Sequence, residues 1–270
     1  MAPSTIIIVP YRDRASHRTI FLKHMPDILL GIDYEIVIVH QDDRRPFNRG
    51  AIKNIGFLYA KKMYPEEYRQ IILVFHDIDI MPWKKGQFSY WTNFREARHF
   101  YGYENVLGGI VAIRGVDFER INGFPNIWTW GWEDTILGER CKLLNININN
   151  SELVDYHNYR DIIHVFHGVK RLISNNIAHK STTSYLNDGI NQLYSVYWVK
   201  DYMDWVDWGD GQDNGLKSER LTQINVKSFE TGESLLSPYV RHMSQQNVFD
   251  GTLSFKPGAP VKLNRMKFRY

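Results

Sequence analysis

The sequence predicts an α/β fold with a mostly parallel central sheet flanked by helices. Short runs of β-branched residues alternate with segments whose apolar residues recur at helical spacing, in the order strand, helix, strand, helix, strand. Each of these apolar runs is followed by a polar loop. The chain of 270 residues, 43% of them hydrophobic, fits one large domain or one domain with an appendage, and this composition excludes general disorder.

The first half of the chain supplies the clearest elements. We expect strands at Ile6–Val9, Tyr34–His40 and Ile71–Phe75, and helices at Ser16–Leu30 and Asn48–Met63. The carboxyl ends of parallel strands form the usual ligand-binding edge of such a sheet. All three loops that follow the strands are therefore expected at one edge.

The second half is less regular. The apolar segment Leu107–Ile113 holds Gly108–Gly109. After it we expect a helix from about Thr135 to Leu144 and strands at Asp161–His167 and Ile190–Val199. The Asn/Ile alternation from residue 145 to 150 is compatible with an edge strand. The segment after about residue 209 contains short strand-like pieces and resembles an appendage.

Charge and cysteine content exclude few classes of function. The net charge of +3 comes from 33 basic and 30 acidic side chains without a long basic run, so no nucleic-acid partner is expected. The single Cys141 cannot form an intrachain disulfide and is expected to be a packing residue. No signal peptide and no apolar stretch of about 20 residues is evident, so no membrane span is expected. These features predict a cytoplasmic or otherwise soluble protein.

Residues 122–135 form the most unusual segment. Three tryptophans lie within five residues and run into Glu133–Asp134, and glycine and proline interrupt regular structure around them. Indole rings suit the faces of sugars, and carboxylates suit hydroxyl groups. The alternative is a buried aromatic turn with a solvated acidic tip, and composition alone does not choose between the two. The tryptophans are Trp128, Trp130 and Trp132.

Two short patterns offer metal ligands. Asp77 and Asp79 follow the third strand, where a turn lets one carboxylate bind Mg²⁺ or Mn²⁺ on a diphosphate while the other contacts a sugar or ribose. An isolated Asp-x-Asp is weak support for a metal. His164 and His167 add imidazoles, which suit Mn²⁺, although two ordinary surface histidines are an equal alternative. On a strict strand they face opposite sides, so His167 is the stronger candidate.

Basic and acidic residues complete the pattern. Arg12 and Arg14 follow the first strand and Arg49 opens the second helix, where arginine can bind phosphate or a uracil carbonyl and Phe47 can stack on a base. The alternative is surface pairing with aspartates. Glu133–Asp134 is the candidate catalytic pair, because displacement at an anomeric carbon needs a base for the acceptor hydroxyl. Acids also favour the first turn of a helix, and both interpretations can hold together.

In this order the motifs resemble the β-1,4-galactosyltransferase family, glycosyltransferase family 7, whose members are inverting nucleotide-sugar transferases with a Rossmann-like GT-A fold. The resemblance covers roughly residues 5–200. Its motifs are Val9–Arg14, Phe47–Arg49, Asn54–Phe57, His76–Asp79, Gly108–Gly109, Asn122–Asn126, Trp130–Asp134, Ile177–His179 and Asp188–Asn191.

The resemblance implies a role for each matching position. Asp134 is the implied general base, with Glu133 beside it on donor-sugar hydroxyls, and Mn²⁺ is the implied cofactor. The implied nucleotide-sugar-binding residues are Pro10, Arg12, Arg14, Phe47, Arg49, Asp77, Ile78, Gly108, Gly109 and Trp130. The implied metal ligands are Asp79, His167 and His164, and the implied acceptor-binding residues are Trp130, Trp132, Asp134 and Thr135. Residues 1–208 would form the GT-A catalytic domain and residues 209–270 a C-terminal extension packed on it.

Departures from the family pattern bear on substrates. Trp132 and Thr135 replace a glycine and an aspartate of the usual Gly-Gly-Glu-Asp-Asp-Asp run, which casts doubt on N-acetylglucosamine as acceptor. Val106 replaces a tyrosine of galactose-specific members, and His164 replaces a methionine at the metal. The partners expected are a UDP-sugar donor, UDP-galactose or UDP-N-acetylgalactosamine, and a glycan or glycoconjugate acceptor. The alternatives are a non-catalytic sugar- or nucleotide-binding module and a transferase for another donor such as UDP-glucose. Family members also carry a membrane anchor and disulfides, and the early first strand here favours a naturally soluble enzyme.

Overall fold

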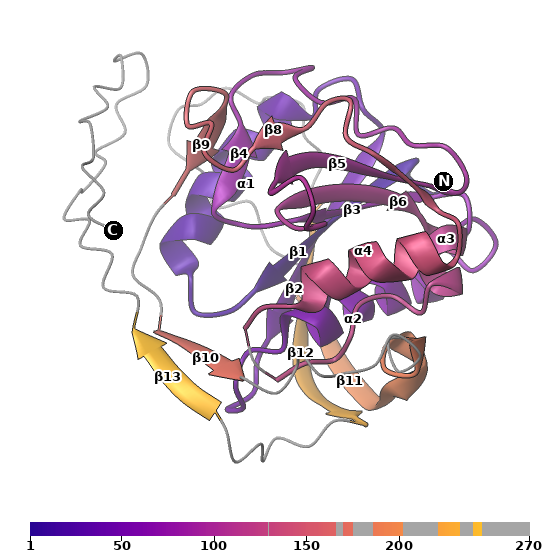
Figure 1. The fold of residues 1–270 in the computed structure, drawn as a ribbon, viewed down its shortest axis with the longest axis vertical. Helices are drawn as coiled ribbons and strands as arrows, with labels where there is room; N and C mark the ends of the chain where they lie inside the picture. Colours follow the sequence, from indigo (N-terminus) through magenta and orange to yellow (C-terminus); the bar gives the residue numbers. More distant parts are fainter. Residues whose placement is uncertain (129, 166–169, 175–185, 202–220, 233–239, 245–270) are drawn as a thin grey trace.

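A mixed, mostly parallel sheet forms the centre of the molecule (Figure 1). The computed structural model describes residues 1–128, 130–165, 170–174, 186–201, 221–232 and 240–244. Nine strands join in the order β11-β12-β2-β1-β3-β6-β5-β7, with β8 paired to β5. The strands of this sheet are β1 (Thr5–Tyr11), β2 (Tyr34–Gln41), β3 (Ile72–His76), β5 (Glu96–Gly102), β6 (Ile110–Arg114), β7 (Asn147–Asn149), β8 (Val154–Asp155), β11 (Leu193–Asp201) and β12 (Leu221–Thr231).

Strands β1, β2 and β3 run parallel, with β1 in the middle. Their residues are buried on both faces, which is why their sequences are continuous β-branched runs rather than alternating ones. Strands β6 and β5 are antiparallel to their neighbours on the β3 side. The predicted strands of the first half are confirmed within one or two residues.

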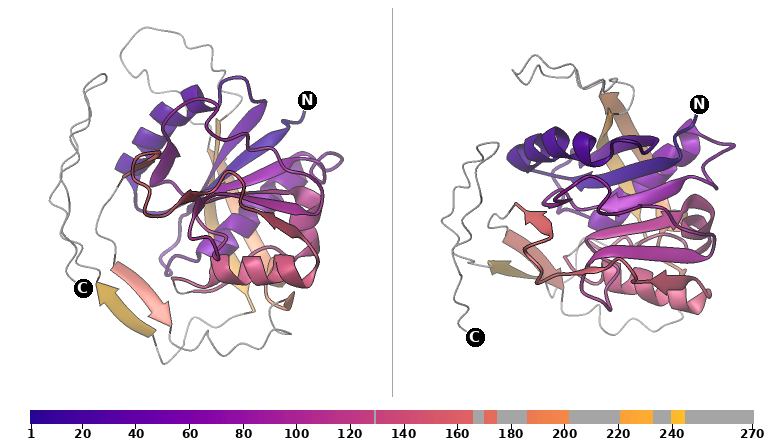
Figure 2. Two further views of the ribbon diagram at one scale, coloured as in Figure 1. Left: turned by 45° about the horizontal axis from the view of Figure 1, so that its top comes forward. Right: turned by 90° about the horizontal axis from the view of Figure 1, so that it is seen from above.

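Helices cover both faces of the sheet (Figure 2). The side chains of Ile6 and Ile8 pack with α2, α3 and α4, whereas those of Ile7 and Val9 pack with α1 on the other face. This alternation follows from the two-residue period of a strand. The helices are α1 (Ala15–Ile28), α2 (Arg49–Met63), α3 (Gly115–Arg120) and α4 (Glu133–Leu143).

Strand β12 belongs to the central sheet although it follows residue 208. It pairs in parallel with β2 and antiparallel with β11. The expected division after residue 208 therefore runs between two paired strands of one sheet. A second C-terminal strand, β13 (Val240–Ser244), pairs with β10 (Lys170–Ser174) in a separate two-stranded sheet.

Other elements differ from the expectation. The strand expected at Asp161–His167 is β9 (Ile162–His164), which pairs with β4 (Ile80–Pro82) rather than joining the central sheet. Residues 190–192 form a 3₁₀ turn before β11 begins. The Asn/Ile segment does form an edge strand, β7. Within the described ranges, no helix is long and apolar enough to cross a bilayer.

Candidate functional site

The loops after β1, β2 and β3 meet at one edge of the sheet, as predicted. Arg12 donates to the backbone carbonyls of Asp43, at 3.0 Å, and of Arg45. Arg14 pairs with Asp79 through an Nη1–Oδ2 distance of 2.8 Å. Pro10 lies at the buried carboxyl end of β1. Direct contacts therefore join the three strand ends that the sequence placed together.

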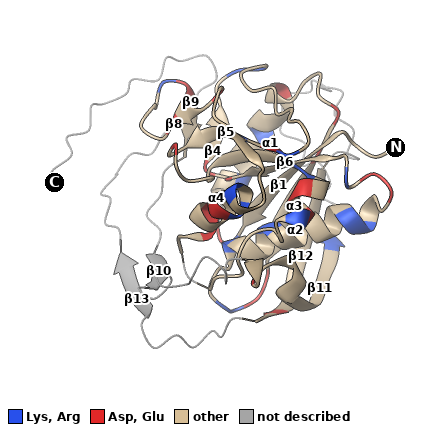
Figure 3. Cartoon of the chain, turned by 45° about the vertical axis from the view of Figure 1, so that its right-hand side comes forward, with Lys and Arg blue, Asp and Glu red and all other residues tan. Residues whose placement is uncertain are grey.

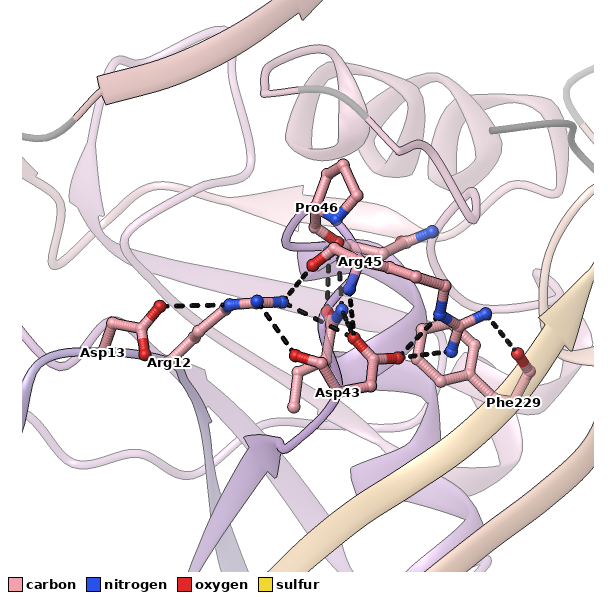
Figure 4. Close-up of polar contacts among 8 residues, drawn as sticks. Arg12, Asp13, Asp43, Arg45, Pro46 and Phe229 are labelled. Carbon is pink, nitrogen blue, oxygen red and sulfur yellow. Dashed lines mark hydrogen bonds and ion pairs between the residues drawn. The ribbon is translucent and has the colours of Figure 1, made fainter. Parts of the chain in front are cut away.

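Arg45 is a member of this edge that the sequence reasoning missed (Figure 4). Its guanidinium pairs with Asp43 at 2.5 Å and donates to the carbonyl of Phe229 at 2.7 Å. It also lies 4.3 Å from the ring centroid of Phe229 and 4.6 Å from that of Trp128. Those two rings stack at 5.2 Å, and Trp128 Nε1 donates to Thr231 Oγ1 at 3.0 Å. Arg45 and β12 thus hold the start of the tryptophan segment.

Asp79 and His164 are brought together by the pairing of β4 and β9. Ile80 lies opposite His164, and the backbone N–H of Val165 donates to the carbonyl of Asp79 at 2.8 Å. His164 Nε2 lies 3.1 Å from the hydroxyl of Tyr101. Burial lowers the pKa of His164 to about 4, against the opposing charge of Asp79. Its imidazole is therefore neutral at pH 7, which is the form that binds metals.

These residues fit Mn²⁺ by the chemistry of their donor atoms. The carboxylate of Asp79 lies just before β4 and the neutral imidazole of His164 ends its partner strand β9, and imidazole favours Mn²⁺ over Mg²⁺. The third predicted ligand, His167, lies outside the described residues. In the part of the chain that the structure describes, no group of three or more His, Cys, Asp or Glu side chains is placed to hold a metal ion.

Arg49 of α2 is the centre of a cluster of charges that includes carboxyl groups from α4 and from the loop after β3. Figure 3 shows the charged positions along α2 and α4. Asn48 caps α2 by accepting from the N–H of Ala51 at 2.9 Å, which sets Arg49 in the first turn. The guanidinium of Arg49 pairs with Asp77, with Glu133 at 2.5 Å and with Asp134 at 3.4 Å. Burial alone would lower the pKa of Arg49, but the charges of these three carboxyl groups outweigh it and raise that pKa well above its usual value.

The pKa values of two carboxyl groups in this cluster shift in opposite directions, although burial acts to raise both. Burial would raise the pKa of Asp77, but Arg49 and Lys53 outweigh it and lower that pKa. For Glu133, burial and then the charge of Asp134 raise the pKa despite Arg49. Among the described residues, Glu133 Oε2 is buried without a hydrogen-bond partner.

Lys53 is the second residue that the sequence reasoning missed. Its Nζ lies 2.8 Å from Asp134 Oδ1, and its side chain is only 3% exposed. The signal was present, because Lys53 follows Arg49 by four residues and shares its face of α2.

Gly108 and Gly109 make room for the candidate base. A Cβ on Gly108 would lie 2.7 Å from Asp134 Oδ2, and one on Gly109 would lie 2.4 Å from the carbonyl oxygen of Tyr101. Gly109 also has a φ of +70°, which favours glycine. Gly108 therefore allows the backbone to approach the carboxylate of Asp134 closely, and Gly109 allows it to approach Tyr101.

The three tryptophans of residues 122–135 fit two different predictions for this segment, a buried aromatic turn and an exposed surface for sugar rings. Trp128 is buried in the core, whereas the side chains of Trp130 and Trp132 are exposed. Trp132 immediately precedes α4 with a φ of +72°, a left-handed conformation that is strained for tryptophan. The segment is thus a buried anchor followed by an exposed aromatic platform.

The remaining predicted residues take ordinary positions. Phe47 is half-buried and packs against the core, and Ile78 is buried. Thr135 is half-buried in the first turn of α4. Their ligand-binding roles stay predictions.

Comparison with known proteins agrees with this geometry. Residues 2–90 match the model of the N-terminal region of glycosyl transferase group 7, and residues 90–167 match that of the N-terminal domain of galactosyltransferase. β-1,4-Galactosyltransferase 4 of Mus musculus is 32% identical over 171 residues, which are 58% of this chain and 48% of that protein. β-1,4-Galactosyltransferase 6 of Homo sapiens is 28% identical over 202 residues, 69% of this chain and 51% of that protein.

A solved structure supports the fold. The catalytic domain of Drosophila β-1,4-galactosyltransferase 7 in complex with xylobiose is 21% identical, with a TM-score of 0.56, covering 83% of this chain and 93% of that one. A mutant of that enzyme in complex with manganese, UDP-Gal and xylobiose has a TM-score of 0.58 at the same coverage. The chain therefore has the GT-A fold of nucleotide-sugar transferases. It belongs to glycosyltransferase family 7, the β-1,4-galactosyltransferases, and spans about half the length of the curated relatives it matches.

Proposed function

We propose that the protein is a metal-dependent inverting glycosyltransferase that moves galactose or N-acetylgalactosamine from a UDP-sugar to a sugar acceptor in β linkage. One observation carries this proposal. The carboxylate of Asp134 is held at the start of α4 against Gly108, at the same sheet edge as Asp77 and Asp79. A base thus lies beside a candidate nucleotide and metal site.

The residues suggest a division of labour. Asp134 takes the proton of the acceptor hydroxyl as that oxygen attacks the anomeric carbon in line, so an α-linked donor gives a β-linked product. In this proposal Arg12 and Arg14 would hold the diphosphate, and Glu133 would hold donor-sugar hydroxyls. Asp79 and His164, with His167 as the expected third ligand, would hold Mn²⁺, which when bound neutralises charge on the departing UDP.

The donor proposal includes N-acetylgalactosamine because of Val106. This residue is half-buried in the turn before Gly108, where its N–H donates to the carbonyl of Tyr103 at 2.9 Å. A valine leaves more room beside the donor sugar than the tyrosine of galactose-specific members. The complex of the Drosophila enzyme with manganese and UDP-Gal supports a UDP-sugar and Mn²⁺ in general.

Turnover assays test the donor and the linkage. Purified protein with Mn²⁺ is offered UDP-galactose, UDP-N-acetylgalactosamine and UDP-glucose together with xylose-, glucose- and N-acetylglucosamine-terminated acceptors, and the product linkage is read by NMR. We expect a β-linked product from both of the first two donors. A strong preference for UDP-galactose would remove N-acetylgalactosamine from the proposal.

The exposed Trp130 and Trp132 would equally serve a non-catalytic sugar-binding module. The buried pairing of Asp134 with Lys53 favours the enzyme, since a module has no use for an oriented base. A thermal-shift titration with UDP separates the two, because the transferase requires stabilisation by UDP that depends on Mn²⁺. Sugar binding without such stabilisation would favour the module.

A further inference from the structure

Lys53 is a buried cation with one carboxylate partner of known geometry. It lies in the middle of α2, and its side chain is 3% exposed. Its Nζ lies 2.8 Å from Asp134 Oδ1 and 4.3 Å from the ring centroid of Phe124. A buried ammonium needs a charged or polar partner, so this ion pair fixes where both side chains lie.

The pairing makes the two oxygens of Asp134 unequal. Oδ1 accepts from Lys53 at 2.8 Å. Oδ2 faces Gly108, where an added Cβ would lie 2.7 Å away, and its hydrogen bond from Arg49 is longer, at 3.4 Å. A carboxylate held through one oxygen cannot rotate freely about its terminal bond. Its other oxygen is therefore presented in a fixed direction.

The charges around Asp134 explain why a second cation is needed. Arg49 already contacts Asp77, Glu133 and Asp134. One guanidinium cannot balance several buried carboxylates, and Arg49 makes its shorter contacts to Asp77 and Glu133. Lys53 supplies the close contact that Asp134 does not receive from Arg49.

We propose that Lys53 is a positioning residue for transfer: it holds Oδ1 of Asp134 so that Oδ2 is presented to the acceptor hydroxyl. This inference rests on the proposed function, in which Asp134 is the base. Lys53 does not touch the reacting atoms in this scheme and acts through Asp134 alone.

The test compares Lys53→Met, which keeps the length of the side chain without its charge, with Lys53→Arg. We expect Lys53→Met to lower kcat about 10- to 100-fold, as misplacement of a catalytic group does. The KM for the UDP-sugar and the Mn²⁺-dependent thermal shift by UDP should stay within about twofold, because donor binding does not use Oδ1. Lys53→Arg should recover part of kcat because it restores a donor to Oδ1. Lys61→Met is the matched control on the same helix, where Lys61 pairs with Glu119 at the surface, and should leave kcat unchanged.

The outcomes separate the two proposals. Wild-type protein without transfer activity overturns the proposed function itself. The positioning role is overturned if the wild type is active and Lys53→Met has the same kcat. It is also overturned if Lys53→Met changes the donor KM and kcat in parallel. If Lys53→Met does not fold, Lys53→Gln in the Asp134→Asn background decides. A role exercised through Asp134 predicts no further loss of the residual rate, and a further tenfold loss contradicts it.

Discussion

The residues around Asp134, the proposed base, and those around Asp79, a proposed metal ligand, differ in how their charges are held, and we call them the base side and the metal side. On the base side, between α2 and α4, the side chains of Lys53 and Glu133 are 3% and 4% exposed and several ion pairs interlock. On the metal side, at the end of β3, Arg14 and Asp79 form one ion pair with side chains 21% and 31% exposed. The same charge chemistry is thus buried in one half and partly solvated in the other.

This difference indicates which side chains of the site are held in place by the folded protein alone. Removing one partner of a buried ion pair leaves an uncompensated charge, so the base-side geometry is strongly held. A partly exposed pair contributes little, and Asp79 can exchange Arg14 for another cation at small cost. The carboxylate of Asp134 is therefore preorganised by the protein, whereas the side chains of Arg14 and Asp79 can rearrange at small cost, as the proposed binding of donor and metal would require.

Loss of the base should have the largest effect. We expect Asp134→Asn to lower transfer about 10²- to 10⁴-fold, the usual contribution of a general base. Donor binding should remain, since the Mn²⁺-dependent thermal shift by UDP reports the metal side. Rates under saturating UDP-galactose or UDP-N-acetylgalactosamine provide the measurement. Activity close to that of the wild type would place the base elsewhere.

Replacing one arginine on each side tests most directly whether the two sides differ in how strongly their ion pairs stabilise the fold. Arg49→Met removes the close partner of the buried Glu133, whose side chain is 4% exposed, and should lower the free energy of unfolding by about 3 to 5 kcal/mol. Arg14→Met, on the metal side, should lower it by no more than about 1 kcal/mol. Urea denaturation of both variants supplies the values. Equal losses would show that the two sides are held alike.

The protonation of His76 predicts how stability falls with acid. This residue is the last of β3, directly before Asp77, and burial lowers its pKa from 6.5 to about 4. Between these values the unfolded chain binds a proton that the folded chain does not, so stability falls as pH falls. The loss approaches about 1.4 kcal/mol per pH unit, or about 3 kcal/mol across the window.

The His76→Gln variant isolates that contribution. Unfolding free energies at pH 7 and pH 4.5 should differ less in His76→Gln than in the wild type. Carboxylates with lowered pKa, such as Asp77, lose their contribution only at lower pH. His164, whose pKa is also lowered to about 4, contributes in the same window but does so in both proteins, so the difference between them reports His76. The same slope in both proteins would show that His76 is not held neutral by the fold.

The sequence predicted the parts of the site whose signals are local. Apolar runs marked β1, β2 and β3, and the charged residues just after them were correctly placed at one edge. Strand β5 was not predicted because polar residues interrupt its apolar pattern. Glu96 and His99 are buried in it, where Glu96 accepts hydrogen bonds from Asn93 and Asn149 and His99 bonds to the carbonyl of Tyr101. The position of β12 beside β2 depends on contacts across almost the whole chain.

Lys53 and Arg45 show why the rest of the site escaped prediction. Each is a basic residue close in sequence to predicted site residues, Phe47 and Arg49. The interaction that gives each its place in the site, however, is with a residue far along the chain. Lys53 meets Asp134, 81 positions away, and Arg45 meets Phe229, 184 positions away. Spacing within a helix can show which face a lysine takes, but only the packed fold shows which carboxylate lies opposite it.

The smallest effect concerns strain at the entrance to the base side. Trp132 has a φ of +72° and precedes Glu133, so the buried pairs of α4 hold a conformation that tryptophan itself disfavours. Trp132→Gly should raise the free energy of unfolding by about 0.5 to 1 kcal/mol, because relief of strain exceeds the added entropy of the unfolded chain. Trp130→Gly is the matched control: Trp130 is similarly exposed and lacks a positive φ, so the same change should lower stability. Thermal unfolding of the two variants checks the signs. A loss of stability in both would mean that the indole of Trp132 contributes more than its backbone costs, and that the aromatic platform is itself part of the base-side structure.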